Sequence, residues 1–206
     1  MQFINALFEE NRKKLEEVQA ANQLLVEENR VLKYRVSDLE CNHNELDQYI
    51  RRENLVISGV PQTESENTDA IALKIAQIAD KNITMSDIDV SHRIGKRKPS
   101  VGQRYNPPSQ IIVRFTSRRA RDAVYKARKN LSTVKTSSLG YEVTNDIYIN
   151  ENLTPIGKAL FTKVNIKRKQ CGWKFLWTHY GKILTKKDEN SPVVYIPNED
   201  SLCKIC

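Results

Sequence analysis

The first fifty residues carry a seven-residue repeat of apolar side chains. One series recurs every seven residues from Ile4 to Leu46, and a second series, four residues later, runs from Phe8 to Ile50. With the first series at heptad position d and the second at position a, the seam continues for more than six heptads. A seam of this length predicts helices that wrap around each other. We therefore expect residues 1–52 to form a coiled coil that oligomerises the chain.

Polar residues interrupt this seam. They are Asn11 at d and Asn22, Asn29 and His43 at a. Such layers cost stability, but they fix register and strand number because a slipped pairing would bury an amide against apolar partners.

The heptads alone do not decide whether two or three helices form the coiled coil, but a charged pair bears on this choice. Arg35 falls at g and Glu40 at e, on either side of the apolar layer that Val36 and Leu39 form. This pattern resembles the Arg-h-x-x-h-Glu signature (h for hydrophobic) of parallel trimeric coiled coils, so we favour a trimer over a dimer. The residues expected to hold the oligomer together are Val18, Leu25, Leu32, Arg35, Val36, Leu39, Glu40 and Leu46.

The net charge of +8 conceals a division along the chain. Residues 93–187 hold 22 Lys and Arg against 4 Asp and Glu, whereas the remainder holds 11 against 21. A region this basic points to a polyanionic partner, and nucleic acid is the usual one. The plainer alternative is a solvated basic surface.

Other features limit the class of protein. No apolar run approaches the ~20 residues of a membrane span, and the charged residues 1–14 are unlike a signal peptide. In a chain with these intracellular features, the four cysteines indicate reduced thiols rather than a disulfide framework. We expect an intracellular protein of the cytoplasm, the nucleus or both, with no membrane contact.

Residues 53–151 alternate between short apolar strands and amphipathic helices. Thr68 is a candidate cap for the first helix and Ser117 for the second. Strands are expected at residues 55–60, 88–95, 110–115 and 147–149. The order β-α-β-β-α-β predicts a ferredoxin-like split βαβ domain, the topology of RNA-recognition motifs. Of the two strands expected at its centre, only the second carries an aromatic residue, Phe115, so binding must rest on cations that contact phosphates.

Residues 152–206 predict a small basic α+β domain, which makes the whole chain α+β. Thr154 at the N-cap and Pro155 at the first helical position begin a helix that Gly172 ends. Strands at residues 173–177 and 182–185 flank a hairpin turn at 179–181, a third strand follows at 193–196, and a short helix starts at Asn198.

Aromatic residues lie among the lysines of this last domain. Trp173, Trp177 and Tyr180 could stack unpaired bases, at ~1–3 kcal/mol for each base. Core packing is the alternative for at least one of the tryptophans.

The expected nucleic-acid contacts are cations of the 96–109 loop and its flanks, of the helix after Ser117, and of the C-terminal domain. A solubilising outer face is the alternative for the helices. The candidates are Arg93, Lys96, Arg97, Lys98, Arg104, Arg114, Arg118, Arg119, Arg121, Lys158, Lys163, Lys167, Arg168, Lys169 and Lys174.

Two stretches of sequence resemble known families. Residues 51–61, 92–95 and 108–115 are similar to the first-open-reading-frame protein of LINE-type retrotransposons. Residues 172–202 resemble the C-terminal domain of the baculovirus few-polyhedra (FP) protein, above all at residues 180–184 and 186–189. The first resemblance implies a trimeric RNA-binding chaperone that packages element RNA into a ribonucleoprotein. By position it also implies RNA contacts by Arg93, Arg97, Arg104 and Lys158, although lysines replace arginines on the C-terminal helix, which weakens bidentate phosphate contacts.

Catalytic or metal chemistry finds little support in the sequence. The three histidines have no matched carboxylate or nucleophile, and the 7 glycines form no phosphate-binding loop. Cys203 and Cys206 have the spacing of half a zinc site, which Cys171 and His179 could complete, but we expect no metal and no cofactor. The sequence thus predicts a non-enzymatic protein that binds single-stranded RNA, or DNA. The alternative is a coiled-coil assembly protein of the viral FP type, in which nucleic-acid binding is secondary.

Overall fold

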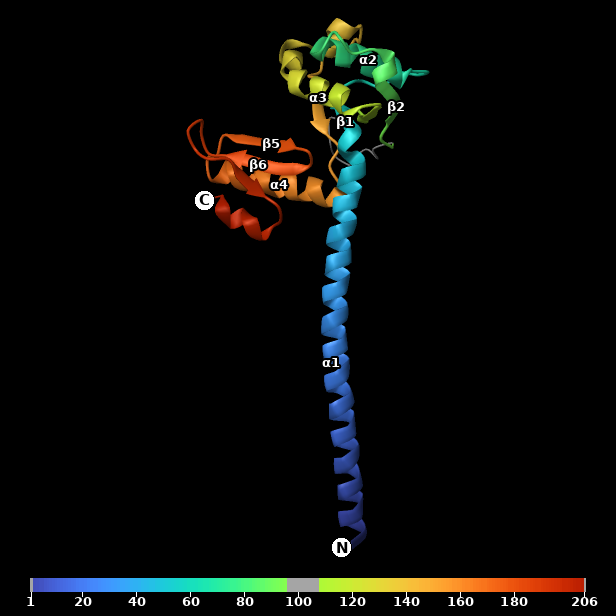
Figure 1. The fold of residues 1–206 in the computed structure, drawn as a ribbon, viewed down its shortest axis with the longest axis vertical. Helices are drawn as coiled ribbons and strands as arrows, with labels where there is room; N and C mark the ends of the chain where they lie inside the picture. The colour runs from blue at the N-terminus through green and yellow to red at the C-terminus, as the bar shows by residue number, and fades with distance from the viewer. Residues whose placement is uncertain (1, 96–107, 206) are drawn as a thin grey trace. The chain divides into compact units, whose positions relative to one another are not determined.

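The structure is a computed structural model that describes residues 2–95 and 108–205. The chain divides into two compact units, Met1–Leu46 and Asp47–Cys206. A single unbroken helix, α1 (Gln2–Ile50), forms the first unit and enters the second (Figure 1). The fold is α+β, with this long helix followed by two antiparallel sheets.

The apolar seam of α1 is exposed in the single chain. The exposed fractions of Leu25, Leu32 and Leu39 are 54%, 49% and 65%. Ion pairs such as Arg30–Glu27, at 2.7 Å, join neighbouring turns, but exposed pairs of this kind add little stability. In one copy of the chain, the apolar side chains of the α1 seam are therefore exposed to solvent.

The first sheet has four strands in the order β2-β3-β1-β4, and every neighbouring pair is antiparallel. The strands are β1 (Asn54–Ser58), β2 (Ile88–Arg93), β3 (Ile111–Phe115) and β4 (Tyr148–Glu151). The register places Val56 opposite both Ile112 and Asn150. The helices α2 (Thr68–Ala79) and α3 (Arg118–Ala127) share one buried core with the strands.

The helix starts of this region confirm one predicted cap and correct the other. The Ser117 side chain accepts a hydrogen bond from the Ala120 amide at 3.2 Å, as expected for an N-cap. Asn67 rather than Thr68 caps α2, because its side chain accepts from the Ala70 amide at 3.0 Å. The Thr68 hydroxyl instead donates to the Ser91 carbonyl at 3.0 Å, which ties the helix start to β2.

The second sheet has three antiparallel strands in the order β5-β6-β7. They are β5 (Phe175–His179), β6 (Lys182–Lys186) and β7 (Val194–Ile196). The helix α4 (Pro155–Gln170) begins as predicted, with the Thr154 side chain accepting from the Gly157 amide at 3.0 Å. Its apolar residues share a core with this sheet. Short 3₁₀ helices complete the chain at Arg51–Glu53, Met85–Asp87, Arg128–Thr133, Thr136–Leu139 and Asp200–Lys204.

The turns explain where the strands begin and end. Tyr180 and Gly181 both have positive φ, at 51° and 78°, and form a two-residue hairpin turn. The predicted turn at 179–181 is one residue longer, because His179 still pairs with Lys182 as the last residue of β5. The strand expected from residue 173 starts at Phe175 because the Trp173 amide still donates to the Arg168 carbonyl at 2.8 Å. The helix α3 also ends earlier than expected, so Leu131 packs into the core from the following 3₁₀ helix.

Within the described part of the chain, no helix is both long enough and apolar enough to cross a membrane.

Candidate nucleic-acid interface

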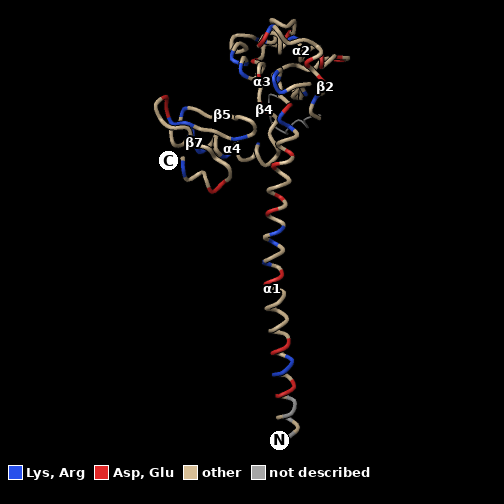
Figure 2. The backbone as a smooth tube through the Cα atoms, in the orientation of Figure 1, with Lys and Arg blue, Asp and Glu red and all other residues tan. Residues whose placement is uncertain are grey.

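The candidate cations fall into an exposed group and a group that the fold uses internally. Figure 2 colours the Lys and Arg residues of the described part of the chain along the backbone. Arg119, Lys169 and Lys174 are exposed. Arg114 on β3 is also exposed, and its Nε lies 3.3 Å from an Asp89 carboxylate oxygen. These side chains are available to solvent and to an anionic partner.

Arg118 lies close to the end of α1. Its guanidinium is half exposed, 3.8 Å from the Glu53 carboxylate and 6.0 Å from the centre of the Tyr49 ring. Arg52 lies over the same ring at 3.2 Å. A phosphate contact by Arg118 would therefore compete with a weak local ion pair.

Arg93, which was predicted to contact RNA, is paired within the fold and mostly buried. Its guanidinium donates to both carboxylate oxygens of Glu66, at 2.7 and 2.8 Å, and its side chain is only 10% exposed. The carbonyls of Val60, Pro61 and Ser109 accept further hydrogen bonds from it. This pairing also lowers the pKa of Glu66. Arg93 is a structural residue whose donors hold three segments of chain together.

Arg121 is a second such residue. It was predicted to contact nucleic acid, with a solubilising outer face as the alternative, but its side chain is only 2% exposed. Its Nη2 donates to the Glu151 carboxylate at 2.6 Å and its Nη1 to Asp122 at 2.9 Å. Arg121 lies three and four residues before the buried Val124 and Tyr125, so it shares the buried face of α3. The prediction rested on its charge and not on this position.

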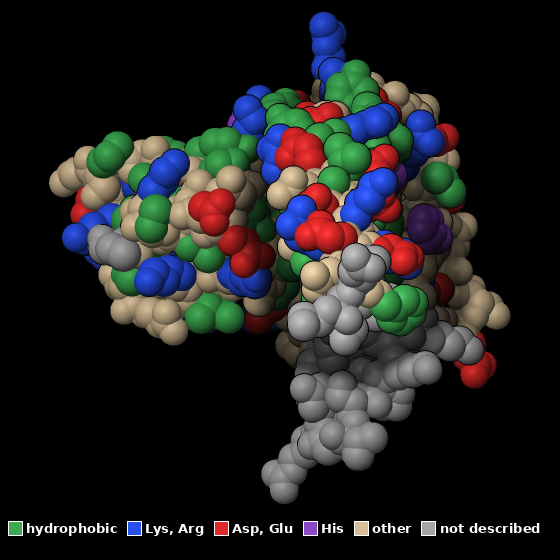
Figure 3. Space-filling model, turned by 90° about the horizontal axis from the view of Figure 1, so that it is seen from below, with side chains coloured by type: hydrophobic (Ala, Val, Ile, Leu, Met, Phe, Trp, Pro, Cys, Tyr) green, Lys and Arg blue, Asp and Glu red, His purple; other side chains and the backbone are tan. Residues whose placement is uncertain are grey.

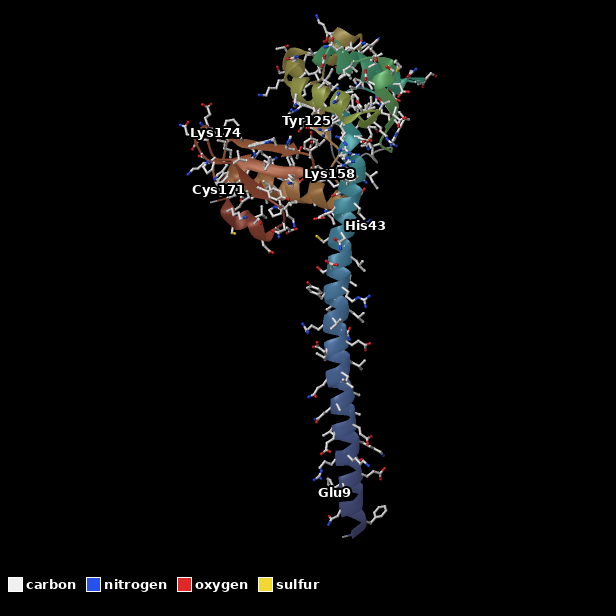
Figure 4. All side chains as sticks on the ribbon, viewed as in Figure 1. Glu9, His43, Tyr125, Lys158, Cys171 and Lys174 are labelled. Atoms are coloured by element: carbon white, nitrogen blue, oxygen red, sulfur yellow. The ribbon has the colours of Figure 1, made fainter. Side chains whose placement is uncertain are left out.

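The candidates on α4 differ in environment. Lys158 lies near the start of the helix, and Figure 4 shows it together with Lys174. Partial burial and the nearby Arg51 guanidinium lower the pKa of Lys158. The Lys163 ammonium contacts the Glu199 carboxylate at 2.5 Å, with both groups about half exposed or more.

Arg168 has a structural role at the end of α4. Its Nε donates to the Asn165 side chain at 2.9 Å, and its Nη1 donates to the carbonyls of Trp173 and Lys174 at 3.2 and 3.0 Å. It therefore fastens the segment that leaves the helix. Lys167 is half-buried beside it.

Four candidates lie outside the described residues. They are Lys96, Arg97, Lys98 and Arg104. In the view of Figure 3, Lys and Arg side chains alternate with acidic and apolar ones and form no unbroken basic patch. The excess of positive charge is thus spread over the part of the surface that this view shows.

The three aromatic residues predicted to stack bases lie in different environments. Trp173 is 8% exposed and belongs to the core between α4 and the second sheet, so core packing accounts for it. The Tyr180 hydroxyl donates to Asp122 at 2.5 Å, which raises the pKa of Tyr180. Trp177 is partly exposed on β5. The sequence analysis did not single out Phe175 and Tyr195, which are exposed on the second sheet. The alternation of side chains along the strands could have indicated them.

The cysteines show no metal arrangement in the described part of the chain. The Cys171 thiol lies 3.2 Å from the Ile205 carbonyl, and Cys203 is exposed. Cys206 lies outside the described residues. Among residues 2–95 and 108–205, no group of three or more His, Cys, Asp or Glu side chains is placed to hold a metal ion.

Comparison with known families finds one match in the C-terminal part. Residues 154–206 match the family model described as Baculovirus FP protein domain 2. The matched segment contains α4, the second sheet and the terminal 3₁₀ helix. This supports the FP resemblance for this segment, whereas the LINE resemblance of residues 51–115 stays a prediction. A comparison with curated proteins found no match.

Proposed function

We propose that the chain is a non-enzymatic, oligomeric protein that binds single-stranded RNA or DNA through phosphate contacts. The observation that carries this proposal is the charge of residues 93–187, with 22 Lys and Arg against 4 Asp and Glu. The internal pairs of Arg93 and Arg121 account for only a small part of this excess. Exposed cations on α3, on α4 and before β5 remain to attract a polyanion.

The first sheet supports a binding mode with weak sequence preference. Its element order and its strand order, β2-β3-β1-β4, are those of a ferredoxin-like split βαβ, so we infer an RNA-recognition-motif type of domain. On the face away from the core, β1 and β3 carry Val56, which is only 3% exposed, together with Ile112 and Arg114. This face lacks the two central aromatics that such domains use to stack bases, so contacts to phosphates dominate and carry little sequence information.

The exposed seam of α1 supports self-association, and we infer a parallel trimer. Three copies of a basic domain on one stalk raise the local concentration of binding sites. One copy then holds a strand while another releases it, which is the condition for exchanging base pairs. The trimer would therefore act as a nucleic-acid chaperone and package RNA into a ribonucleoprotein.

The salt dependence of binding tests the proposal. The full chain should shift a single-stranded RNA, with log affinity falling linearly against log salt. Neutralising Arg119, Lys126 and Lys129 together to Gln should flatten this slope by up to roughly 2 units, at ~0.7 for each lost phosphate contact. A matched control replaces Lys13, Lys74 and Lys81 with Gln, because these exposed lysines lie outside residues 93–187 and outside the heptad seam, and their loss removes the same charge. Equal slopes for the two triple variants would contradict the proposed interface.

A second candidate function is that of an assembly protein, in which oligomerisation through the coiled coil is the main role and nucleic-acid binding is secondary. The match of residues 154–206 to domain 2 of the baculovirus FP protein favours it. The same RNA-binding experiment distinguishes the two candidate functions. An oligomer that binds no single-stranded RNA at low salt would support the assembly protein.

A further inference from the structure

The three-stranded sheet β5-β6-β7 has one face in the core and one face outside it. The strand register groups Thr178, Ile183 and Ile196 on the inner face, where Ile183 and Ile196 pack against α4 residues. Because side chains alternate along a strand, the residues between them point the other way. The outward positions are Phe175, Trp177, His179, Lys182, Leu184, Lys186 and Tyr195.

An aromatic row crosses this outer face. The register places Trp177 opposite Leu184, and Leu184 opposite Tyr195, on three adjacent strands. Phe175 lies two residues before Trp177 on the same strand, about 7 Å away along it. Phe175 and Tyr195 are 38% and 44% exposed, and Trp177 and Leu184 in the middle of the row are partly exposed. None of these four side chains belongs to a buried core of the described residues.

Cations border the aromatic row on both sides. Lys182 is paired with His179 across the strands, and its ammonium lies 5.8 Å from the centre of the Tyr195 ring. Lys186 is paired with Phe175, and its ammonium donates to the Glu189 backbone carbonyl, which leaves further donors. No outward position of the three strands holds Asp or Glu. The charge of this face is therefore complementary to an anion and unfavourable for a basic or a purely apolar partner.

We propose that this face, with Phe175, Trp177 and Tyr195 as stacking residues and Lys182 and Lys186 as phosphate contacts, binds unpaired bases of a single-stranded nucleic acid. The proposal deepens the proposed function and rests on it, since it names where bases are held. Aromatic rings stack on any base, so the face binds without strong sequence preference. A duplex hides the faces of its bases, so the site selects single strands. The exposed cations of α3 and α4 then supply further phosphate contacts, and the second sheet holds the bases.

Loss of the aromatic rings tests this site in the full-length chain. The probes are a single-stranded oligouridylate and heparin, a polyanion without bases. Trp177→Leu and Tyr195→Leu keep apolar bulk but remove the ring. Each should weaken oligouridylate binding by about 5-fold to 150-fold, the range that stacking of one base gives, and should leave heparin binding unchanged. Oligouridylate should also quench the part of the tryptophan fluorescence that Trp177→Leu removes.

Tyr34→Leu is the matched control. Tyr34 is 77% exposed at position f of the heptad, away from the seam, so its loss should leave both affinities unchanged. Equal losses for oligouridylate and heparin would overturn the stacking site, because they would reflect charge or misfolding rather than rings. A change of oligomeric state in Tyr195→Leu would also overturn it, since the face would then be covered by a second copy.

The result for the unaltered chain separates this inference from the proposed function. If the unaltered chain binds oligouridylate with a steep salt slope and both ring variants bind equally well, only the stacking site is wrong. If the unaltered chain binds no oligouridylate at low salt, the proposed function and the stacking site both fail.

Discussion

Arg121 and Glu151 form a buried ion pair in the unit Asp47–Cys206, with 2.6 Å between Nη2 and the carboxylate and each side chain 2% exposed. The Glu151 carboxylate also accepts hydrogen bonds from the amides of Tyr180 and Gly181, both at 2.9 Å. Arg121 belongs to α3, Glu151 ends β4, and the two amides form the hairpin turn between β5 and β6. One carboxylate thus joins the helix of the first sheet to the turn of the second.

Glu151→Gln should destabilise this unit by about 3–5 kcal/mol. The change leaves the Arg121 guanidinium buried without its counter-charge, and breaking a buried pair from one side costs this much. Urea unfolding, followed by tryptophan fluorescence, measures the effect, since both tryptophans lie in this unit. Glu199→Gln, which removes the exposed pair with Lys163, is the control and should cost less than about 1 kcal/mol. Equal effects would mean that the buried pair contributes no more than a surface one.

The sequence predicted the elements of this unit better than the roles of its charged residues. Ser117, Thr154 and Pro155 marked two helix starts correctly, because capping is a local interaction that a few residues determine. The internal ion pairs of Arg93 and Arg121 were not predicted, for the opposite reason. Their partners Glu66 and Glu151 lie 27 and 30 residues away, so only the folded chain brings the pairs together.

Some strand boundaries also differ from those that the sequence predicted. β1 stops at Ser58, before Gly59 with φ +96°, although apolar residues continue to Val60. In the sequence, only the alternation of side chains along each strand indicated the aromatic row on the second sheet. The register that aligns Trp177 with Tyr195 depends on pairing across three strands, so the sequence alone did not predict the row. The oligomer of α1 stays a prediction, since a partner helix is not part of a single chain.

The Arg93–Glu66 pair should make stability depend on acid. The Arg93 guanidinium lowers the pKa of Glu66 from 4.5, so the folded chain favours the ionised carboxylate. The contribution of the pair is present above pH 4.5 and is lost as the pH falls through the lower folded pKa. The difference in unfolding free energy between the unaltered chain and Glu66→Gln should therefore shrink in acid. Glu64→Gln, at an exposed neighbour, should show no such change. A constant difference across pH would contradict the role of the pair.

Gly59→Ala should destabilise the first sheet more than Gly140→Ala. Both glycines have positive φ, at 96° and 94°, so alanine is strained at either, by about 1–2 kcal/mol. Only at Gly59 would the added Cβ also meet backbone, 1.9 Å from the Asp146 carbonyl oxygen, whereas at Gly140 nothing lies within 4 Å. The two variants thus share the strain and differ in the clash. Thermal unfolding of both should give a lower midpoint for Gly59→Ala, and equal midpoints would show that the Asp146 segment moves aside without cost.

Leu32→Ala with Leu39→Ala should dissociate the oligomer. Both side chains lie at position d of the heptad and are exposed in one chain, at 49% and 65%, so a partner helix must bury them. Each truncation removes about 2–5 kcal/mol of buried contacts for every copy. Sedimentation equilibrium of the full chain should therefore show a trimer that the double variant converts to monomer. The control changes Leu24 and Val31 to Ala, since both lie at position c outside the seam, and it should leave the trimer intact. A monomer at every concentration of the unaltered chain would exclude the coiled coil, whereas a dimer would exclude only the choice of three strands.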